Sequence, residues 1–283
     1  MQLSGSNYGM PNLSLDAALA FHAELGLRAM ELTVLPGYVT ALENLSSADR
    51  SAARAQFKQR GIACSGVANF QTLTDPDSEP TSTVMARHRG AIELAVELAQ
   101  AGQQPLVVFM SGGGVNEWPE ARERLVNRVG ELAEFASTHG VVLAMKAHAN
   151  GCVSRPHQLV ELFEHVGSRA FRFCFDMSHY EVQGLSIEQA MYPLLALSAH
   201  VEVKASIGQA PNQEYMIPGE SGTQSDFVGQ FKAMSKLGYR GYVVPEMSVH
   251  VMRRPTYNPY AALRLATQSL GRLMDNESSF RLT

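Results

Sequence analysis

Charged side chains stand at the ends of four apolar segments in the second half of the chain. The segment Phe171–Phe175 is followed by Asp176 and, three residues further on, by His179. Lys146 and His148 lie at the end of a second apolar segment, and Glu202 and Lys204 lie in and after a third. The fourth segment ends in Glu246. Several carboxylates that converge on one point suit a divalent cation. They equally suit acid–base chemistry on a carbon next to a carbonyl. The fold must therefore be one that brings these four segment ends together.

Short apolar runs alternate with longer amphipathic segments along the whole chain. The predicted strands are residues 1–8, 29–34, 62–70, 105–110, 141–147, 171–175, 200–205 and 242–246. The predicted helices are residues 14–25, 47–59, 84–101, 119–138, 156–166, 187–198, 226–237 and 259–274. Eight strand–helix units without a linker predict an α/β fold, a single (β/α)8 TIM barrel that forms one domain over residues 1–283. Residues 71–83 and the Gly-, Pro- and Gln-rich stretch after residue 205 are predicted loops.

Strand periodicity predicts which of these side chains share a face. Successive strand residues point to opposite sides, so Glu202 and Lys204 face away from Val201 and Val203. Lys146 and His148 likewise share one face. In a barrel of this type, residues at the carboxyl ends of the strands surround the active site. Further candidates for substrate contacts are Glu31, in the predicted strand 29–34, and Arg253, after the last strand. Four histidines in helical segments are expected at the surface: His22, His139, His157 and His165.

Charge, apolar runs and cysteine content indicate which partners and which cellular location to expect. The formal net charge is −4 and no basic block is present, which argues against nucleic acid as the main partner. No apolar run is long enough to span a bilayer, and the first residues do not read as a signal peptide. Three widely spaced cysteines are typical of reduced thiols, so we expect a cytoplasmic protein. The stretch Gly5–Gly9 does not match a dinucleotide fingerprint, so no nucleotide cofactor is expected.

Several motifs in register with the predicted strands resemble the xylose isomerase-like barrel family, which includes sugar isomerases and epimerases, inosose dehydratases and the endonuclease IV group. The motifs are Leu143–His148 (LAMKAH), Phe175–His179 (FDMSH), His200–Lys204 (HVEVK), Gly238–Tyr242 (GYRGY) with Glu246, and Pro218–Glu220 (PGE) followed by Asp226–Phe227 (DF). The resemblance covers nearly the whole chain. It implies a small carbohydrate substrate and, because members are often dimers or tetramers, a homo-oligomer.

The resemblance also implies roles for the residues. Family members hold a divalent cation (Mn²⁺ or Mg²⁺, with Zn²⁺ a further choice) through Glu, Asp, His and Glu on strands five to eight. Here Asp176 and Glu246 match, whereas Lys146 stands in place of the first Glu and Glu202 in place of the His. The implied metal ligands are Asp176, Glu202 and Glu246. The predicted catalytic residues are Glu246, Lys146 and His179, and the substrate contacts predicted from their positions are His148, Glu31, Lys204 and Arg253.

Three chemical interpretations of the altered site stay open. In the first, a cation binds through Asp176, Glu202 and Glu246, with His179 as an additional candidate ligand, and Lys146 faces the substrate. In the second, no metal binds, and Lys146 is clamped by acids and stabilises an enolate oxygen itself. In the third, Lys146 is a Schiff-base nucleophile, which requires a lowered pKa; neighbouring carboxylates oppose this.

Three functions fit these residues. The first is a sugar, keto-sugar or polyol isomerase or epimerase that abstracts a proton next to a carbonyl. The second is a lyase or dehydratase acting on a keto-sugar or inosose, which forms the same enolate and then expels a leaving group. The third is a barrel that has lost its metal and binds a sugar without catalysis. An endonuclease is disfavoured by the negative charge and by Met110, which stands where a histidine ligand would be needed.

Overall fold

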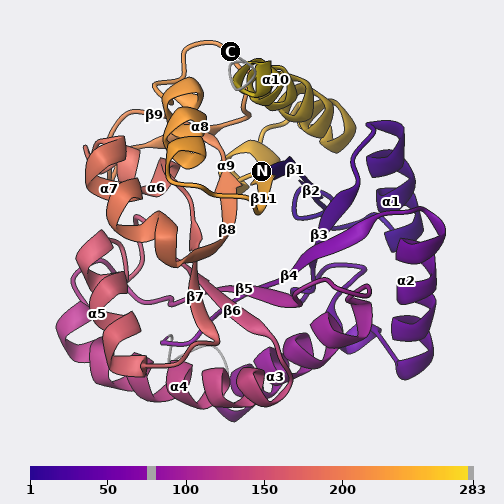
Figure 1. Cartoon of the computed structure of the whole chain (residues 1–283), viewed down its shortest axis with the longest axis horizontal. Helices are drawn as coiled ribbons and strands as arrows, with labels where there is room; N and C mark the ends of the chain where they lie inside the picture. The colour runs from indigo at the N-terminus through magenta and orange to yellow at the C-terminus, as the bar shows by residue number, and fades with distance from the viewer. Residues whose placement is uncertain (75–80, 280–283) are drawn as a thin grey trace.

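The strands lie in the middle of the molecule and the helices surround them (Figure 1). This computed structural model describes residues 1–74 and 81–279, of which residues 276–279 are described by their backbone alone. Part of the predicted loop over residues 71–83 therefore lies outside the described residues.

One parallel sheet forms the barrel, with the strand order β1-β11-β8-β7-β6-β5-β4-β3-β2. Its strands are β1 (Gln2–Leu3), β2 (Gly5–Ser6), β3 (Ala29–Thr33), β4 (Ala63–Thr72), β5 (Leu106–Met110), β6 (Val142–Lys146), β7 (Phe171–Phe175), β8 (Ser198–Val203) and β11 (Tyr242–Pro245). β1 and β2 are two halves of one strand interrupted at Ser4. The backbone N–H of Ser4 donates to the carbonyl oxygen of Val243 over 2.9 Å, which closes the sheet on itself. The predicted (β/α)8 barrel is confirmed.

Helices follow the strands and cover the outside of the barrel (Figure 1). The longer ones are α1 (Leu15–Glu24), α2 (Ser47–Gln59), α3 (Thr81–Leu98), α4 (Trp118–Thr138), α5 (Pro156–Val166), α7 (Ile187–Leu194), α8 (Phe227–Lys236) and α10 (Pro259–Ser279). Local sequence sets their ends: α2 begins with a capping box between Ser46 and Asp49, and α5 begins at Pro156 and ends before Gly167, whose φ is 61°. For these two helices the predicted bounds agree with the structure.

Short elements near the mouth of the barrel were not predicted. These are α6 (Ser178–Glu181), α9 (Val249–Met252), the 3₁₀ helix Leu42–Asn44, and the antiparallel hairpin β9 (Ala205–Ile207) and β10 (Glu214–Met216). A second 3₁₀ helix, Leu195–Leu197, directly precedes β8 and lies within the predicted helix 187–198. The hairpin occupies the stretch predicted as a loop. It was missed because its strands are short and its connection is rich in residues typical of loops. The hairpin matters because it brings Tyr215 over the barrel mouth.

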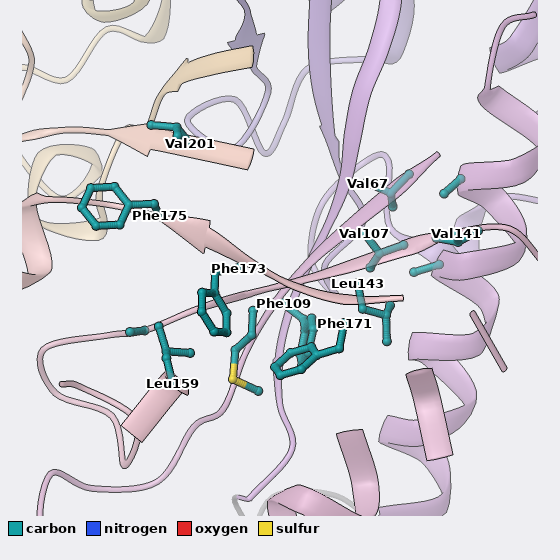
Figure 2. Close-up of a cluster of buried hydrophobic side chains, with 14 of the residues drawn as sticks. Val67, Val107, Phe109, Val141, Leu143, Leu159, Phe171, Phe173, Phe175 and Val201 are labelled. Atoms are coloured by element: carbon teal, nitrogen blue, oxygen red, sulfur yellow. The ribbon is translucent and has the colours of Figure 1, made fainter. Parts of the chain in front are cut away.

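Each strand buries one side under the helices and the other inside the barrel. The outer side of β7 presents Phe171, Phe173 and Phe175 to a large apolar cluster beneath the helices (Figure 2). Its inner side places Cys174 in a small separate cluster with Ala144 of β6. Because successive side chains of a strand point to opposite sides, the outer side of the sheet forms an apolar layer against the helices. The inner side lines the barrel interior, which also holds charged groups.

The four helical histidines separate into two groups. His139, His157 and His165 are exposed, as predicted. The prediction for His22 was wrong: its side chain is fully buried on the inner side of α1. Its Nδ1 donates to the carbonyl oxygen of Ala18 over 2.7 Å, and its ring lies against Gly5, where an added Cβ would be 2.3 Å from Nε2. A small residue on the first strand thus makes room for the imidazole, which the pattern of α1 alone does not reveal.

Among the helices that the structure describes, none is long and apolar enough to cross a membrane.

Candidate active site

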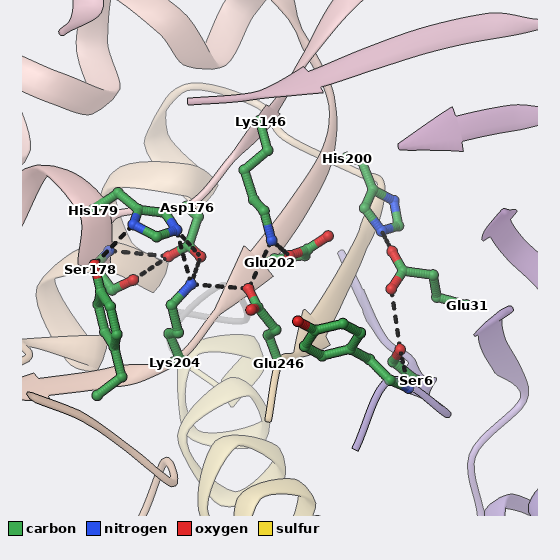
Figure 3. Close-up of polar contacts among 12 residues, drawn as sticks. Ser6, Glu31, Lys146, Asp176, Ser178, His179, His200, Glu202, Lys204 and Glu246 are labelled. Atoms are coloured by element: carbon green, nitrogen blue, oxygen red, sulfur yellow. Dashed lines mark hydrogen bonds and ion pairs between the residues drawn. The ribbon is translucent and has the colours of Figure 1, made fainter. Parts of the chain in front are cut away.

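Strand β8 and the residue after it carry three ionisable side chains on the inner side of the barrel: His200, Glu202 and Lys204. All three are buried, whereas Val201 and Val203 between them pack outward into the large apolar cluster. The predicted alternation placed Glu202 and Lys204 on one face, and the structure has them so. Each of the three side chains meets charged partners from other strands, which produces successive polar layers inside the barrel (Figure 3).

The first of these layers pairs His200 with Glu31. Nε2 of His200 lies 3.0 Å from Oε2 of Glu31, and Oε1 of Glu31 accepts a hydrogen bond from Oγ of Ser6 over 3.1 Å. Glu31 is 1% exposed. The structure thus gives Glu31 partners inside the barrel, and it is not one of the described residues that line the cavity at the mouth.

Lys146, at the end of β6, forms the next layer. Its Nζ donates to Oε2 of Glu202 over 2.5 Å and to Oε2 of Glu246 over 2.7 Å. The same ammonium lies 4.2 Å from the centre of the Phe70 ring. An ammonium has three N–H donors, and the two carboxyls use two of them. The third N–H of Lys146 is therefore unused by the carboxyls, on the side of the ammonium that faces the Phe70 ring and the cavity.

Lys204, between β8 and β9, forms the layer nearest the mouth. Its Nζ donates to Oδ2 of Asp176, to Oε2 of Glu246 over 2.8 Å, and to Nε2 of His179, 3.0 Å away. All three donors are used within the protein. Asp176, which follows β7, is fixed in turn by Ser178, whose backbone N–H and hydroxyl both donate to Oδ1, over 3.0 Å and 2.6 Å.

The orientation of His179 follows from its neighbours. An ammonium has no lone pair, so Nε2 must accept the hydrogen bond from Lys204, and we assign the ring proton to Nδ1, which lies 2.8 Å from the hydroxyl oxygen of Tyr215. The backbone N–H of Ala149 also points at Nδ1, over a longer 3.3 Å, and we give the shorter contact with the ammonium precedence. Burial and the nearby Lys204 hold the pKa of His179 well below its usual range, in keeping with a neutral ring. His179 is 1% exposed and contacts Lys204 from behind, so it orients the lysine and does not reach the cavity.

Opposite charges decide the protonation of the central groups. Burial opposes the charged form of Lys146, but Glu202, Glu246 and Asp176 outweigh it and raise its pKa well above the usual range. Burial likewise opposes the charge on Lys204, and Asp176 and Glu246 raise its pKa. The pKa of Glu246 is held well below its usual range: burial opposes this, and the two lysines outweigh it. Both lysines are thus ammonium ions beside an ionised Glu246.

The pKa of Glu202 is shifted in the opposite direction to that of Glu246. Burial raises its pKa well above the usual range, Glu31 and Glu246 add to the effect, and Lys146 counteracts it only in part. The side chain is 0% exposed, and its Oε1 has no hydrogen-bond partner among the described residues. An oxygen buried in this way favours the neutral, protonated carboxyl.

A cavity of about 230 Å³ opens above these layers, at the carboxyl ends of the strands. Its lining includes five of the predicted residues, Lys146, His148, Lys204, Glu246 and Arg253. Asp176, His179 and Glu202 lie beneath or behind it. Glu246 is the most accessible of the three carboxyls, at 9% exposed against 1% for Asp176 and 0% for Glu202. The structure therefore leaves Glu246 as the carboxylate that a substrate can reach.

His148 faces this cavity as a neutral ring. Burial and the nearby lysines lower its pKa to about 4. Its Nδ1 accepts a hydrogen bond from the backbone N–H of Asn150 over 3.2 Å, so its proton lies on Nε2 and makes that atom a donor.

Other parts of the lining come from residues that were not predicted to belong to the site. These are Tyr8, Phe70, Met110, Asn150, Tyr215, Ser248, Val249 and His250. They lie in strand ends, in loops that follow strands, in the β9–β10 hairpin and in α9. Position after a strand was the available signal for most of them, and for Tyr215 no signal existed because the hairpin was not predicted. Aromatic faces and hydroxyl, amide and imidazole groups together suit a small molecule rich in hydroxyls.

The side chains do not fit a divalent cation in this arrangement. Asp176, His179 and Glu246 offer ligand atoms within 4.8 Å of one another, the spacing of a three-ligand site. Lys204 donates a hydrogen bond to all three of these side chains and so fills the point between them. The second such group, Glu31, His200 and Glu202, is joined internally by the His200–Glu31 contact and capped by Lys146. A protonated lysine repels a cation and is no ligand for it.

Comparison with known proteins identifies what the barrel resembles. A family model described as xylose isomerase-like TIM barrel matches residues 19–270. None of the curated proteins matches the sequence. One similar solved structure is an L-ribulose 3-epimerase, with a TM-score of 0.77 and 16% identity over 99% of this chain and 97% of that one.

Two further structures are similar over nearly their whole length. A probable 3-DHS dehydratase from Bacillus anthracis has a TM-score of 0.74 and 14% identity, covering 96% of this chain and 99% of that one. A protein named IOLI, solved with a bound zinc atom, has a TM-score of 0.77 and 17% identity, covering 98% of this chain and 99% of that one. At these identities the likeness establishes the fold.

Proposed function

Since this chain belongs to the xylose isomerase-like TIM barrel family, we propose that it is an isomerase or epimerase that acts on a small sugar or keto-sugar by moving a proton next to a carbonyl. The observation that carries the proposal is the pairing of Glu246, the accessible carboxylate, with the spare N–H donor of Lys146 on the same cavity. The similar structures include an L-ribulose 3-epimerase and a probable dehydratase, which supports enzymatic activity of this general kind.

The cavity supports a substrate of monosaccharide size. Its volume of about 230 Å³ lies below the ~300–1,000 Å³ typical of sites for drug-sized ligands. Tyr8 and Phe70 offer aromatic faces for C–H groups, while His148, Asn150 and Ser248 offer partners for hydroxyls. Arg253, also on the lining, is exposed and makes no ion pair with any residue that the structure describes. It is free to hold an oxygen at the outer end of the substrate.

The proposed reaction has two proton transfers. Lys146 donates its third N–H to the substrate carbonyl oxygen, and Glu246 takes the proton from the adjacent carbon through Oε1, the oxygen that neither lysine uses. The C–H electron pair becomes the enediol or enolate double bond, and the negative charge on oxygen is held by the ammonium. Return of the proton from Glu246 to the neighbouring carbon gives an isomer, whereas an epimer forms when a proton from solvent reaches the opposite face of the first carbon and the proton on Glu246 passes to solvent.

The low pKa of Glu246 makes it a weak base, so the substrate proton must be made more acidic. Lys146 does this from a site with little water, where its charge is poorly screened. Lysine as a Schiff-base nucleophile is not part of the proposal, because the raised pKa of Lys146 keeps the amine protonated.

The test is deuterium incorporation from D₂O into a panel of ketoses and aldoses, followed by proton NMR. We expect exchange at the carbon next to the carbonyl with at least one panel member, and its loss in Glu246→Gln. Glu134→Gln, a change of the same type on the exposed face of α4, is the control. Absence of exchange across the panel while a sugar still binds would favour the non-catalytic barrel.

A second candidate is a lyase, which the similarity to a dehydratase favours. The enolate is the same, and a leaving group on the next carbon departs with its bonding electrons after taking up a proton. Mass spectrometry of the product separates the two: an isomer keeps the substrate mass, whereas a dehydration product is lighter by one water.

A further inference from the structure

The Lys204 ammonium stands where a three-ligand cation would stand. It donates to Asp176, His179 and Glu246, the three side chains whose ligand atoms lie within 4.8 Å of one another. The proton assignment of His179 suits this use, because Nε2 presents a lone pair to the lysine as it would to a metal. The three side chains converge on the nitrogen of Lys204 as ligands converge on a metal ion.

The charges of the site are balanced in the same way. With Glu202 neutral, two carboxylates (Asp176 and Glu246) and two ammoniums (Lys146 and Lys204) have a formal sum of −2 + 2 = 0. The same two carboxylates and one divalent cation would have the same sum. Two lysines thus supply the positive charge that would otherwise come from an ion, and they bring it on tethered side chains.

Lys204 is also held in place from every side. It is 2% exposed, and its ammonium lies 5.0 Å from the centre of the Tyr215 ring. All three of its donors are used within the protein, whereas Lys146 keeps one for the cavity. The two lysines therefore have different tasks: Lys146 faces the substrate, and Lys204 holds the converging carboxylates together.

We propose that the ammonium of Lys204 is a built-in replacement for the divalent cation, so that this barrel works without a metal, and that removal of the Lys204 side chain converts Asp176, His179 and Glu246 into a divalent-cation site. The inference concerns the ion at the site and is tested by binding, so it holds or fails independently of which sugar, if any, is turned over.

The experiment compares metal binding by the wild type and Lys204→Ala after dialysis against a chelator. Elemental analysis and calorimetric titration with Zn²⁺ and with Mn²⁺ are the readouts. The wild type is expected to hold no stoichiometric metal and to show no saturable binding. Lys204→Ala is expected to bind about one ion per chain, since it then offers three protein ligands and an open position. Lys232→Ala, on the exposed face of α8, should behave as the wild type.

A double variant locates the ion. Lys204→Ala combined with Asp176→Asn removes a carboxylate ligand and should abolish the gain in binding. Because Lys204→Ala removes the ammonium that joins two buried carboxylates, Asp176 and Glu246, its melting temperature should fall and should recover when the ion is added. If the alanine variant does not fold, Lys204→Gln is measured in the same way, and the wild-type result stands by itself.

Two outcomes overturn the proposal. The first is a wild-type protein that binds one divalent ion per chain and loses it in Asp176→Asn. The second is a folded Lys204→Ala or Lys204→Gln variant that binds no ion, which would show that the three side chains are not placed as a ligand set.

Discussion

The ammonium of Lys204 donates a hydrogen bond to Oε2 of Glu246 over 2.8 Å at the base of the cavity. The same oxygen also accepts from Lys146 over 2.7 Å. Glu246 is therefore fixed by two cations through one oxygen, and its other oxygen remains for the substrate. This arrangement joins the two lysines into one site and gives rise to the predictions below.

Loss of the ammonium at Lys146 should remove the group that stabilises the enolate. For Lys146→Met, which keeps the length of the side chain, we expect kcat to fall by about 10²–10³-fold with a smaller change in KM. Steady-state kinetics on the sugar identified by deuterium exchange measures this, with Lys232→Met as the surface control. A kcat within a factor of two of the wild type would remove Lys146 from the chemistry.

Neutralising Glu202 should cost far less stability than neutralising Asp176. Because the raised pKa of Glu202 favours a neutral carboxyl, Glu202→Gln should change the free energy of unfolding by less than about 1 kcal/mol. Asp176→Asn removes the charge that faces Lys204 and should cost about 3–5 kcal/mol. Urea unfolding at pH 7 compares the two variants, and equal losses would show that Glu202 is ionised in the folded protein.

The hydroxyl of Tyr215 should influence the reaction through His179 and Lys204. Tyr215→Phe keeps the aromatic face and removes the partner of Nδ1 of His179. We expect kcat to fall by about 10-fold, as when a group that orients a ligand is lost. The nitrogen-15 chemical shift of Nδ1 of His179 should change in the variant because its N–H loses the acceptor oxygen, which a purely steric effect would not produce. An unchanged shift and an unchanged kcat would contradict this role.

Stability should fall as the pH is lowered from about 6.5 to about 4, because buried histidines resist protonation. Burial lowers the pKa of His22 and of His88 to about 4, whereas the pKa of a solvent-exposed imidazole is 6.5. Between these values the unfolded chain binds more protons than the folded one, so acid favours unfolding. Each residue accounts for about 3 kcal/mol across this window.

The contribution of His22 can be isolated by substitution. The urea midpoint of His22→Gln should depend less on pH between 6.5 and 4 than that of the wild type. His157→Gln, in which the replaced histidine is exposed, should leave the pH dependence unchanged. Identical slopes for the wild type and His22→Gln would mean that His22 is already protonated in the folded state.

The sequence predicted the barrel and most of the strand-end residues because both follow from local patterns. Alternation in His200–Ala205 placed Glu202 and Lys204 on the inner face, and closure of eight strands then brings them to Lys146 and Glu246. The partners could not be predicted, because which carboxyl each ammonium meets depends on the stagger between distant strands. Lys204 was predicted to contact the substrate, whereas in the structure its ammonium also donates a hydrogen bond to Asp176.

Features that depend on contacts between distant segments escaped prediction. The burial of His22 requires Gly5, which lies on a different element. Tyr215 reaches the mouth only because short segments, 205–207 and 214–216, pair as a hairpin. Neither segment has a propensity strong enough to mark it as a strand, so the residue that orients His179 could not be found from the sequence.

If Glu246 and Lys146 move a proton without the help of a metal, the reaction should not depend on divalent ions. The rate of deuterium incorporation into the responsive sugar is therefore determined on one preparation before and after exhaustive chelation and again after addition of Mn²⁺. We expect the same rate in all three samples. A rate that disappears with the chelator and returns with Mn²⁺ would contradict metal-free proton transfer.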